Sequence, residues 1–274
     1  MPARKIKWTD MLPHEFVEAR NNYPVCWMAY GLAEPHGAFN ALGLDWLKAD
    51  GITKLAAQKH GGIVAPPFAW HVHEVPEFHG DGKTPGWLRN VGVYEPFCNS
   101  IPPRLFAQIA FFNIRTFDAR NFRAAILITG HCGGPEHILK KACQFYTERT
   151  GSPIRLYALC DAECIDRSLP FRGDHAGMTE TSQLMALHPD LVDLNNKTCS
   201  PDLGERYAGN INFDKQPLPS IKIGEEIIES QIKNLGIIAQ DLLNGYVPVE
   251  NWTAPDLNEA QILADEFVAT ELDK

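Results

Sequence analysis

The stretch AAILITGHCGG, residues 124–134, is the part of this 274-residue chain that decides its fold. Its first half, AAILIT, is a short apolar run of the kind that forms a buried strand. Its second half is a glycine-rich turn, after which a helix is predicted from Pro135. A strand, a glycine turn and a helix in succession are the βα unit of a parallel sheet.

The same alternation continues on both sides of this unit. Strands are predicted at 23–30 (YPVCWMAY), at 154–160 (IRLYALC) and within 62–70, where Pro66-Pro67 interrupts the run. Apolar residues at helical spacing predict helices at 9–20, 45–58, 104–117, 181–187, 225–243 and 257–272. The chain is therefore predicted to be α/β, a single domain over 1–274 whose mostly parallel sheet is flanked by helices.

Two parts of the predicted domain lie outside the strand–helix alternation. The segment at about 71–98 is rich in His, Gly and Pro, which predicts a loop-rich excursion with a functional role. The part from about 223 onward is predicted to be helical.

Composition excludes several classes of partner. The net charge is −9 and the basic residues are scattered, so neither nucleic acid nor an anionic membrane surface is an expected partner. No apolar stretch approaches the roughly 20 residues of a transmembrane helix, and the first residues lack a signal-peptide core. The seven cysteines include no CxxC pair, which predicts reduced thiols and a cytoplasmic protein, with Cys160 and Cys164 as core residues.

Potential metal ligands follow or border three of the predicted strands. Glu34 and His36 follow the first strand, His131 follows AAILIT, and His175 and Glu180 lie beyond IRLYALC. Ligands of open parallel sheets bind outside the carboxyl ends of the strands, so these segments are expected to converge at one edge.

Carboxylates and imidazoles are the ligand types of a divalent-metal hydrolase. Glu34 and His36 are one residue apart, so in an extended segment their side chains point the same way. Asp45, near a helix start, is placed to close the site. Each residue alone is more often a surface acid or a core histidine. Jointly, Glu34, His36, Asp45, His131 and Glu180 are too many ligands for one tetrahedral zinc and suit two metals that share a carboxylate.

The three segments resemble the motifs of the creatininase family over roughly residues 20–195. The family motif GSxExHGPHLPLxTD is similar to residues 31–45, with Glu34, His36 and Asp45 at matching positions. The motif NGHGGN resembles residues 129–134. The motif HAGExETS resembles residues 175–182, and it is the most specific of the three.

This resemblance implies a creatininase-like fold and an amidohydrolase that cleaves a C–N bond in a cyclic or small linear amide. It implies two divalent ions, zinc, manganese or iron. Glu34, Asp45 and His131 would hold one ion, and His36, Asp45 and Glu180 the other, with Asp45 bridging them. His175 would act as a proton shuttle near the substrate.

The chain also departs from the family motifs. Gly133 stands where creatininase itself carries a glutamate, Gly134 replaces an asparagine, and Met178 replaces the first glutamate of the third motif. Because all five core ligands are present, these departures predict an altered specificity, with a substrate other than creatinine and with Glu180 as the replacement ligand.

Two other interpretations stay open at this point. His71 and His73 form an H-x-H pair after an apolar run, as in TIM-barrel amidohydrolases, although together with His79 they are better explained as pocket or loop residues. The second alternative is a non-catalytic metal-binding or assembly protein on the creatininase scaffold.

The resemblance also implies a homo-oligomer, with a hexamer as the expected form. Apolar and aromatic residues such as Trp46, Phe111 and Phe112 exceed the needs of one helix face, which supports self-association.

Light scattering at micromolar concentration should therefore report a mass several times that of one chain; a monomer would refute this prediction.

Overall fold

The computed structural model describes residues 4–73, 98–197, 211, 213 and 217–272. Its sheet has four parallel strands in the order β2-β1-β3-β4. The central strands are β1 (Val25–Tyr30) and β3 (Ala124–Thr129), and the outer strands are β2 (Ile63–Val64) and β4 (Arg155–Cys160). Val25 pairs with Ala124, which in turn pairs with Arg155, so β1, β3 and β4 end level with one another.

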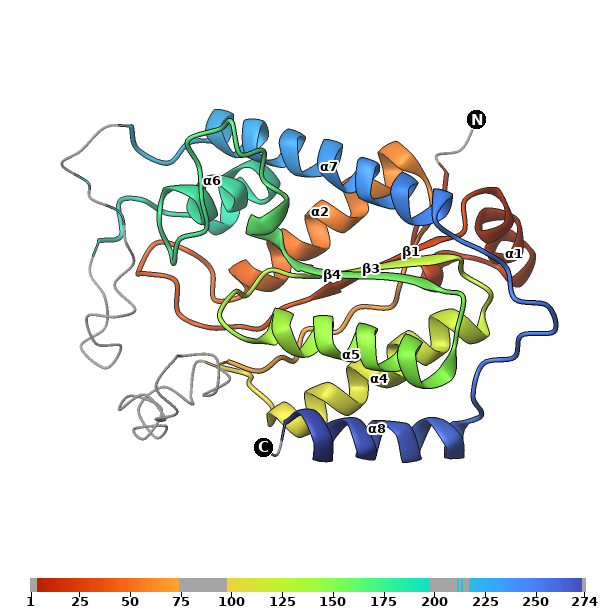
Figure 1. The fold of residues 1–274 in the computed structure, drawn as a ribbon. Helices are drawn as coiled ribbons and strands as arrows, with labels where there is room; N and C mark the ends of the chain where they lie inside the picture. Colours follow the sequence, from red (N-terminus) through yellow and green to blue (C-terminus); the bar gives the residue numbers. More distant parts are fainter. Residues whose placement is uncertain (1–3, 74–97, 198–210, 212, 214–216, 273–274) are drawn as a thin grey trace.

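Helices cover both faces of the sheet (Figure 1). One face carries α2 (Leu44–His60), α6 (Met178–Leu187) and α7 (Ile221–Asn244). The other carries α4 (Pro103–Ala119), α5 (Pro135–Thr150) and α8 (Leu257–Glu271). Helix α1 (Pro13–Asn22) and the short 3-10 helices Trp8–Asp10, Asp161–Cys164 and Pro189–Leu191 complete the described elements.

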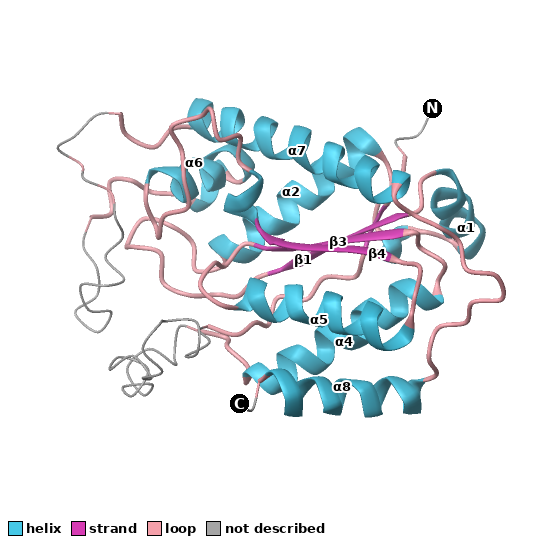
Figure 2. Ribbon diagram, in the orientation of Figure 1, coloured by secondary structure: helices cyan, strands magenta, loops and turns pink. Residues whose placement is uncertain are grey.

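The layered arrangement explains why β1 and β3 are apolar throughout. Every residue of both strands is buried, since helices lie above and below them (Figure 2). Alternate side chains enter different cores. Met28 and Tyr30 pack in the core beside α4, whereas Val25 and Trp27 pack in the core beside α2 and α7.

The predicted fold class is confirmed, and the strand predicted at 124–129 is observed with those bounds. The strand predicted within 62–70 is only two residues long, because the chain turns away toward Pro66-Pro67. The TIM-barrel alternative is wrong, since the described strands form an open four-stranded sheet.

Residues 74–97 of the predicted excursion, His79 among them, lie outside the described residues. Within the described part, no helix combines the length and apolarity needed to cross a membrane.

One cysteine pair departs from the prediction of reduced thiols. Cys132, next to His131, is paired with Cys160 at the end of β4, across a Cα–Cα distance of 5.7 Å. Spacing along the chain gave no sign of this pair, because 28 residues separate its members. Cys164 is a buried core residue, as predicted.

Candidate metal centre

The predicted ligands converge at the carboxyl ends of the strands. Glu34 and His36 follow β1, His131 follows β3, and Asp45 lies in the first turn of α2. Glu180 lies in the first turn of α6, the next helix after β4 and its short 3-10 helix. All five side chains are buried although each carries an ionisable group. Buried charges of this kind require partners of opposite charge or a metal ion.

A first group consists of Glu34, Asp45 and His131. His131 Nδ1 lies 3.0 Å from both Glu34 Oε1 and Asp45 Oδ2. Its Nε2 contacts the carbonyl oxygen of His73, and because a carbonyl only accepts, Nε2 carries the hydrogen. Without a metal ion, a proton on Nδ1 lets the ring pair with both carboxylate oxygens, and these oxygens hold the pKa of His131 well above its usual range. A neutral ring would instead direct the Nδ1 lone pair at a metal ion bound between the ring and the carboxylates.

A second group consists of His36, Asp45 and Glu180. His36 Nε2 lies 3.2 Å from Asp45 Oδ1 and 3.5 Å from Glu180 Oε2. His36 Nδ1 donates to the carbonyl of Glu34 at 3.1 Å, so Nε2 faces the carboxylates. Asp45 therefore belongs to both groups, with Oδ2 directed at the first and Oδ1 at the second.

The donor atoms fit a metal ion. In each group, one ligand atom per residue lies within 4.8 Å of the others, a spacing that one ion can bridge. Glu34 Oε1 and His36 Nε2 are buried and have no hydrogen-bond partner among the described residues. Burying such atoms unpaired is costly, and coordination would satisfy both.

Electrostatics point the same way. Burial would raise the pKa of Glu34, but the positive charge of a protonated His131 at 3.0 Å and the contact with His73 outweigh burial and hold that pKa well below its usual range. Burial would lower the pKa of His36, but the carboxylates, Asp45 first, raise it to about 9. The carboxylates thus stabilise positive charge at this centre, whether an imidazolium or a metal ion carries it.

His175 lies at the margin of the centre. Its ring lies against that of His36 with centroids 4.6 Å apart, and its Nδ1 is 3.9 Å from Glu34 Oε1. About a third of its side chain is exposed (34%), unlike the buried ligands. Burial and the charge of His36 lower the pKa of His175 to about 4, so its imidazole is neutral at pH 7. Its distance from Glu34 and His36 would also allow it to join them as a ligand.

Comparison with protein families now assigns the chain. The family model named Creatininase, described as creatinine amidohydrolase, matches residues 9–221. The chain belongs to the creatininase family. Its members are amidohydrolases, which places the chain among hydrolases of non-peptide C–N bonds.

Solved structures of the creatininase fold agree with this assignment. A creatininase crystal structure superposes with a TM-score of 0.64 at 18% identity, covering 90% of this chain and 100% of its own. A structure titled "Creatininase Mn" gives 0.63 at 20% identity, covering 89% and 100%. A Bacteroides fragilis NCTC 9343 protein, provisionally named a creatinine amidohydrolase, gives 0.61 at 18%, covering 88% and 97%. At these identities the likeness shows the fold alone. No curated protein sequence matches the chain.

Three charged or polar residues near the two ligand groups were not among the predicted ligands. His73 Nε2 lies 2.6 Å from Glu34 Oε2. Lys48 and Asp161 are buried together behind Glu180. Sequence signals for both exist: Lys48 is three residues after Asp45 on one helix face, and Asp161 directly follows β4.

His71 has a different environment from His73. It is fully buried against the ring of Phe106, Nδ1 contacts the carbonyl of Val72 at 2.8 Å, and Nε2 contacts Thr129 Oγ1 at 3.1 Å. Both ring nitrogens are thus occupied by neighbours outside the two ligand groups. His71 packs between Phe106 and Thr129 beside the centre and does not form an H-x-H metal pair with His73.

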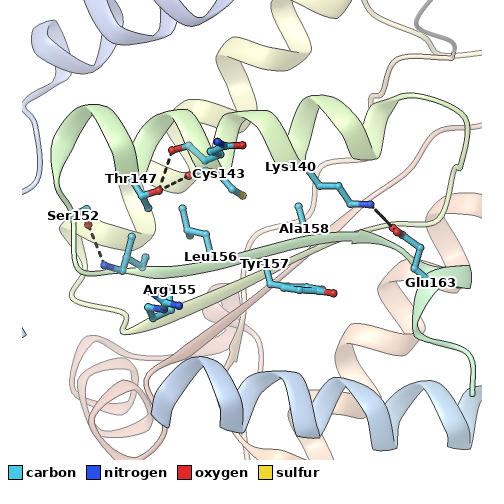
Figure 3. Close-up of a pocket in the computed structure, with 11 residues that line it drawn as sticks. Lys140, Cys143, Thr147, Ser152, Arg155, Leu156, Tyr157, Ala158 and Glu163 are labelled. Atoms are coloured by element: carbon cyan, nitrogen blue, oxygen red, sulfur yellow. Dashed lines mark hydrogen bonds and ion pairs between the residues drawn. The ribbon is translucent and has the colours of Figure 1, made fainter. Parts of the chain in front are cut away.

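A cavity of about 450 Å³ lies elsewhere on the molecule, between α5 and β4 (Figure 3). An ion pair of 2.7 Å between Lys140 and Glu163 lies at one end. Its described lining residues include none of the predicted ligands. Volume alone therefore does not locate the chemistry of this protein, and the buried ligand groups remain the candidate site.

Asp45 is positioned by close backbone packing at two glycines. A Cβ at Gly130 would collide with the carbonyl oxygen of Asp45, and a Cβ at Gly31 would lie 2.6 Å from the backbone of Trp46. Only glycine therefore lets the ends of β1 and β3 approach the first turn of α2.

Gly130→Ala should displace Asp45 and weaken binding of Mn²⁺ or Zn²⁺ by about tenfold or more, the scale of lost support around a ligand. Isothermal titration of the metal-stripped protein measures this. Gly43→Ala is the matched control, because its Cβ would make only ordinary contacts with the side chain of Leu47. Unchanged binding in Gly130→Ala would contradict this account.

Burial lowers the pKa of His71 to about 3, whereas an unfolded histidine titrates near 6.5. Between these values the unfolded chain binds more protons, so this residue makes the free energy of unfolding fall as pH falls. From pH 7 to pH 5 the loss should be about 2 kcal/mol. Urea denaturation should show a pH dependence smaller by about that amount in His71→Gln, and an unchanged dependence in exposed His14→Gln.

Proposed function

We propose that this protein is a metal-dependent amidohydrolase that uses two divalent ions to cleave the C–N bond of a cyclic or small linear amide other than creatinine. One observation carries the proposal: Asp45 directs one carboxylate oxygen to each of two buried ligand groups. A shared carboxylate between two sites is the arrangement of two-metal hydrolases. Glu34 and His131 complete one site, and His36 and Glu180 complete the other.

The identity of the ions follows the family. Structures of related creatininases are named for manganese and for a Zn-Zn form, and the oxygen and nitrogen ligands here suit zinc, manganese or iron. When bound, two divalent ions at such a centre polarise a carbonyl oxygen and activate water at neutral pH.

Proton transfer to the leaving group is the role of His175. Its imidazole is neutral near pH 7, partly exposed, and adjacent to both Glu34 and His36. It can accept a proton at the centre and deliver it to the leaving nitrogen of the amide, as a general acid–base does. His73 lies against Glu34 and is partly exposed, so it is placed to contact a substrate that approaches the centre.

Substrate choice is where this chain departs from creatininase. Gly133 has no side chain, and a Cβ there would meet nothing within 4 Å. Because residue 133 is glycine, the chain lacks the glutamate that creatininase carries at that position. Glu180 approaches the second group from α6 instead. A ligand that comes from another direction reshapes the pocket, so creatinine should be a poor substrate.

Metal analysis of protein purified without chelator, followed by assays on a panel of cyclic and linear amides that includes creatinine, tests this function. We expect at least one equivalent of metal and turnover of an amide other than creatinine. Metal with no turnover of any amide would favour a non-catalytic binding or assembly protein. Protein that binds no divalent ion would refute the proposal.

His175→Ala should keep the metal and lose about 10²- to 10⁴-fold in kcat, the usual loss for a general acid–base. Asp45→Asn should lose metal and activity together, because it serves both groups. His14→Ala, on the exposed face of α1, is the control and should change neither. Loss of metal from His175→Ala would show that His175 is a ligand, and an unchanged kcat would show that it is structural.

A further inference from the structure

Lys48 is a fully buried lysine at the edge of the second ligand group. It lies one helical turn after Asp45 on α2, with about 2% of its side chain exposed. Its ammonium contacts Glu180 Oε1 directly and lies 3.5 Å from Asp161 Oδ1 and 3.7 Å from Asp45 Oδ1. Three carboxylates around one ammonium keep it charged.

The surroundings of Lys48 hold it in place. The other oxygen of Asp161, Oδ2, accepts hydrogen bonds from Gln183 Nε2 at 3.0 Å and Gln231 Nε2 at 3.3 Å. These residues belong to α6 and α7, so helices on one face of the sheet fix the ion pair. Lys48, Asp161 and both glutamines are buried, so the ammonium is shielded from solvent.

Lys48 divides the two oxygens of Glu180 between different partners. Oε1 is held by the ammonium, whereas Oε2 accepts from the backbone N–H of Ala176 at 2.9 Å and faces His36 Nε2. Glu180 can therefore offer one oxygen, Oε2, to an ion in the second group. Neither Glu34 nor His131 of the first group has an ion pair with Lys48.

An ammonium beside two ligands of the second group repels a divalent ion there. At separations of a few ångströms in a partly buried site, repulsion between such charges changes a binding constant by well over tenfold. In the first group, the ammonium approaches only the shared ligand Asp45, and on its far oxygen, Oδ1. The two groups are therefore electrostatically unequal.

We propose that Lys48 is a built-in cation of the second group, which positions Glu180 to offer one oxygen and weakens divalent-ion binding there, so that the first group fills first. This inference rests on the proposed metal centre. It assigns Lys48 a role in metal loading that a merely structural ion pair with Asp161 would not have.

Titration of metal-stripped protein with Mn²⁺ tests this inference, with free Mn²⁺ measured by electron paramagnetic resonance. The wild type should bind two ions, the second at least tenfold more weakly. Lys48→Met should tighten the second ion at least tenfold and change the first less than about threefold, because the repulsion acts mainly on the second group. Lys48→Arg, which keeps the charge, should retain weak second binding.

Lys54→Met is the matched control. Lys54 lies on the same helix nine residues after Asp45 and pairs with Asp50, and its side chain is 37% exposed. The Lys54→Met variant should leave the binding constants of both Mn²⁺ ions unchanged. Since Lys48→Met leaves Asp161 buried without its cation, the double variant Lys48→Met/Asp161→Asn removes both charges and should tighten the second ion as well.

The possible results distinguish a failure of the role of Lys48 from a failure of the proposed metal centre. Wild-type protein that binds no Mn²⁺ refutes the proposed metal centre. Wild-type protein that binds two ions equally well, or a folded Lys48 variant whose second ion binds no more tightly, overturns the role of Lys48 and leaves the metal centre standing.

Discussion

The shared carboxylate of Asp45 is the constraint on which the rest of this centre depends. Its two oxygens lie 3.0 Å from His131 and 3.2 Å from His36, so a shift of its backbone would change both ligand groups together. Its position in the first turn of α2 favours a carboxylate through the helix dipole. The glycines at the ends of β1 and β3 allow the sheet to approach that turn closely. The packing of the sheet against α2 thus fixes the residue that both ligand groups share.

The centre concentrates more negative charge than a protein interior ordinarily tolerates. Glu34, Asp45, Asp161 and Glu180 are all buried, and only one buried lysine lies among them in the described structure. Folding such a set costs free energy unless cations neutralise it. Lys48 offsets part of this charge, and the two histidine ligands or divalent ions offset the rest. A site that requires cations for its own stability is well suited to hold metal.

Much of this arrangement could be predicted from the chain. AAILIT and its glycine turn predicted a strand and the start of a helix, because apolar runs and glycines act locally. Register then follows from parallel pairing, which brings strand ends level. This explains why Glu34, His36 and His131, each close behind a strand, were identified and do lie together. The short strand β2 was overestimated, since pairing length depends on where neighbouring strands diverge and not on apolarity.

Residues whose partners lie far away along the chain could not be identified from the sequence. The spacing from Asp45 places Lys48 on the same helix face, but only the packing of α2 against α6 and α7 brings it to Glu180 and Asp161. Cys132 and Cys160 pair because β3 and β4 are neighbours, a fact of strand order that spacing does not reveal. His71 and His73 share one motif but have different surroundings in the structure, since His71 contacts Thr129 and His73 contacts Glu34. The sequence by itself determined the fold class, the strand ends and the kinds of ligand, because these depend on local pattern. The tertiary structure alone decided which charges meet, because that depends on how helices far apart in the chain pack over one sheet edge.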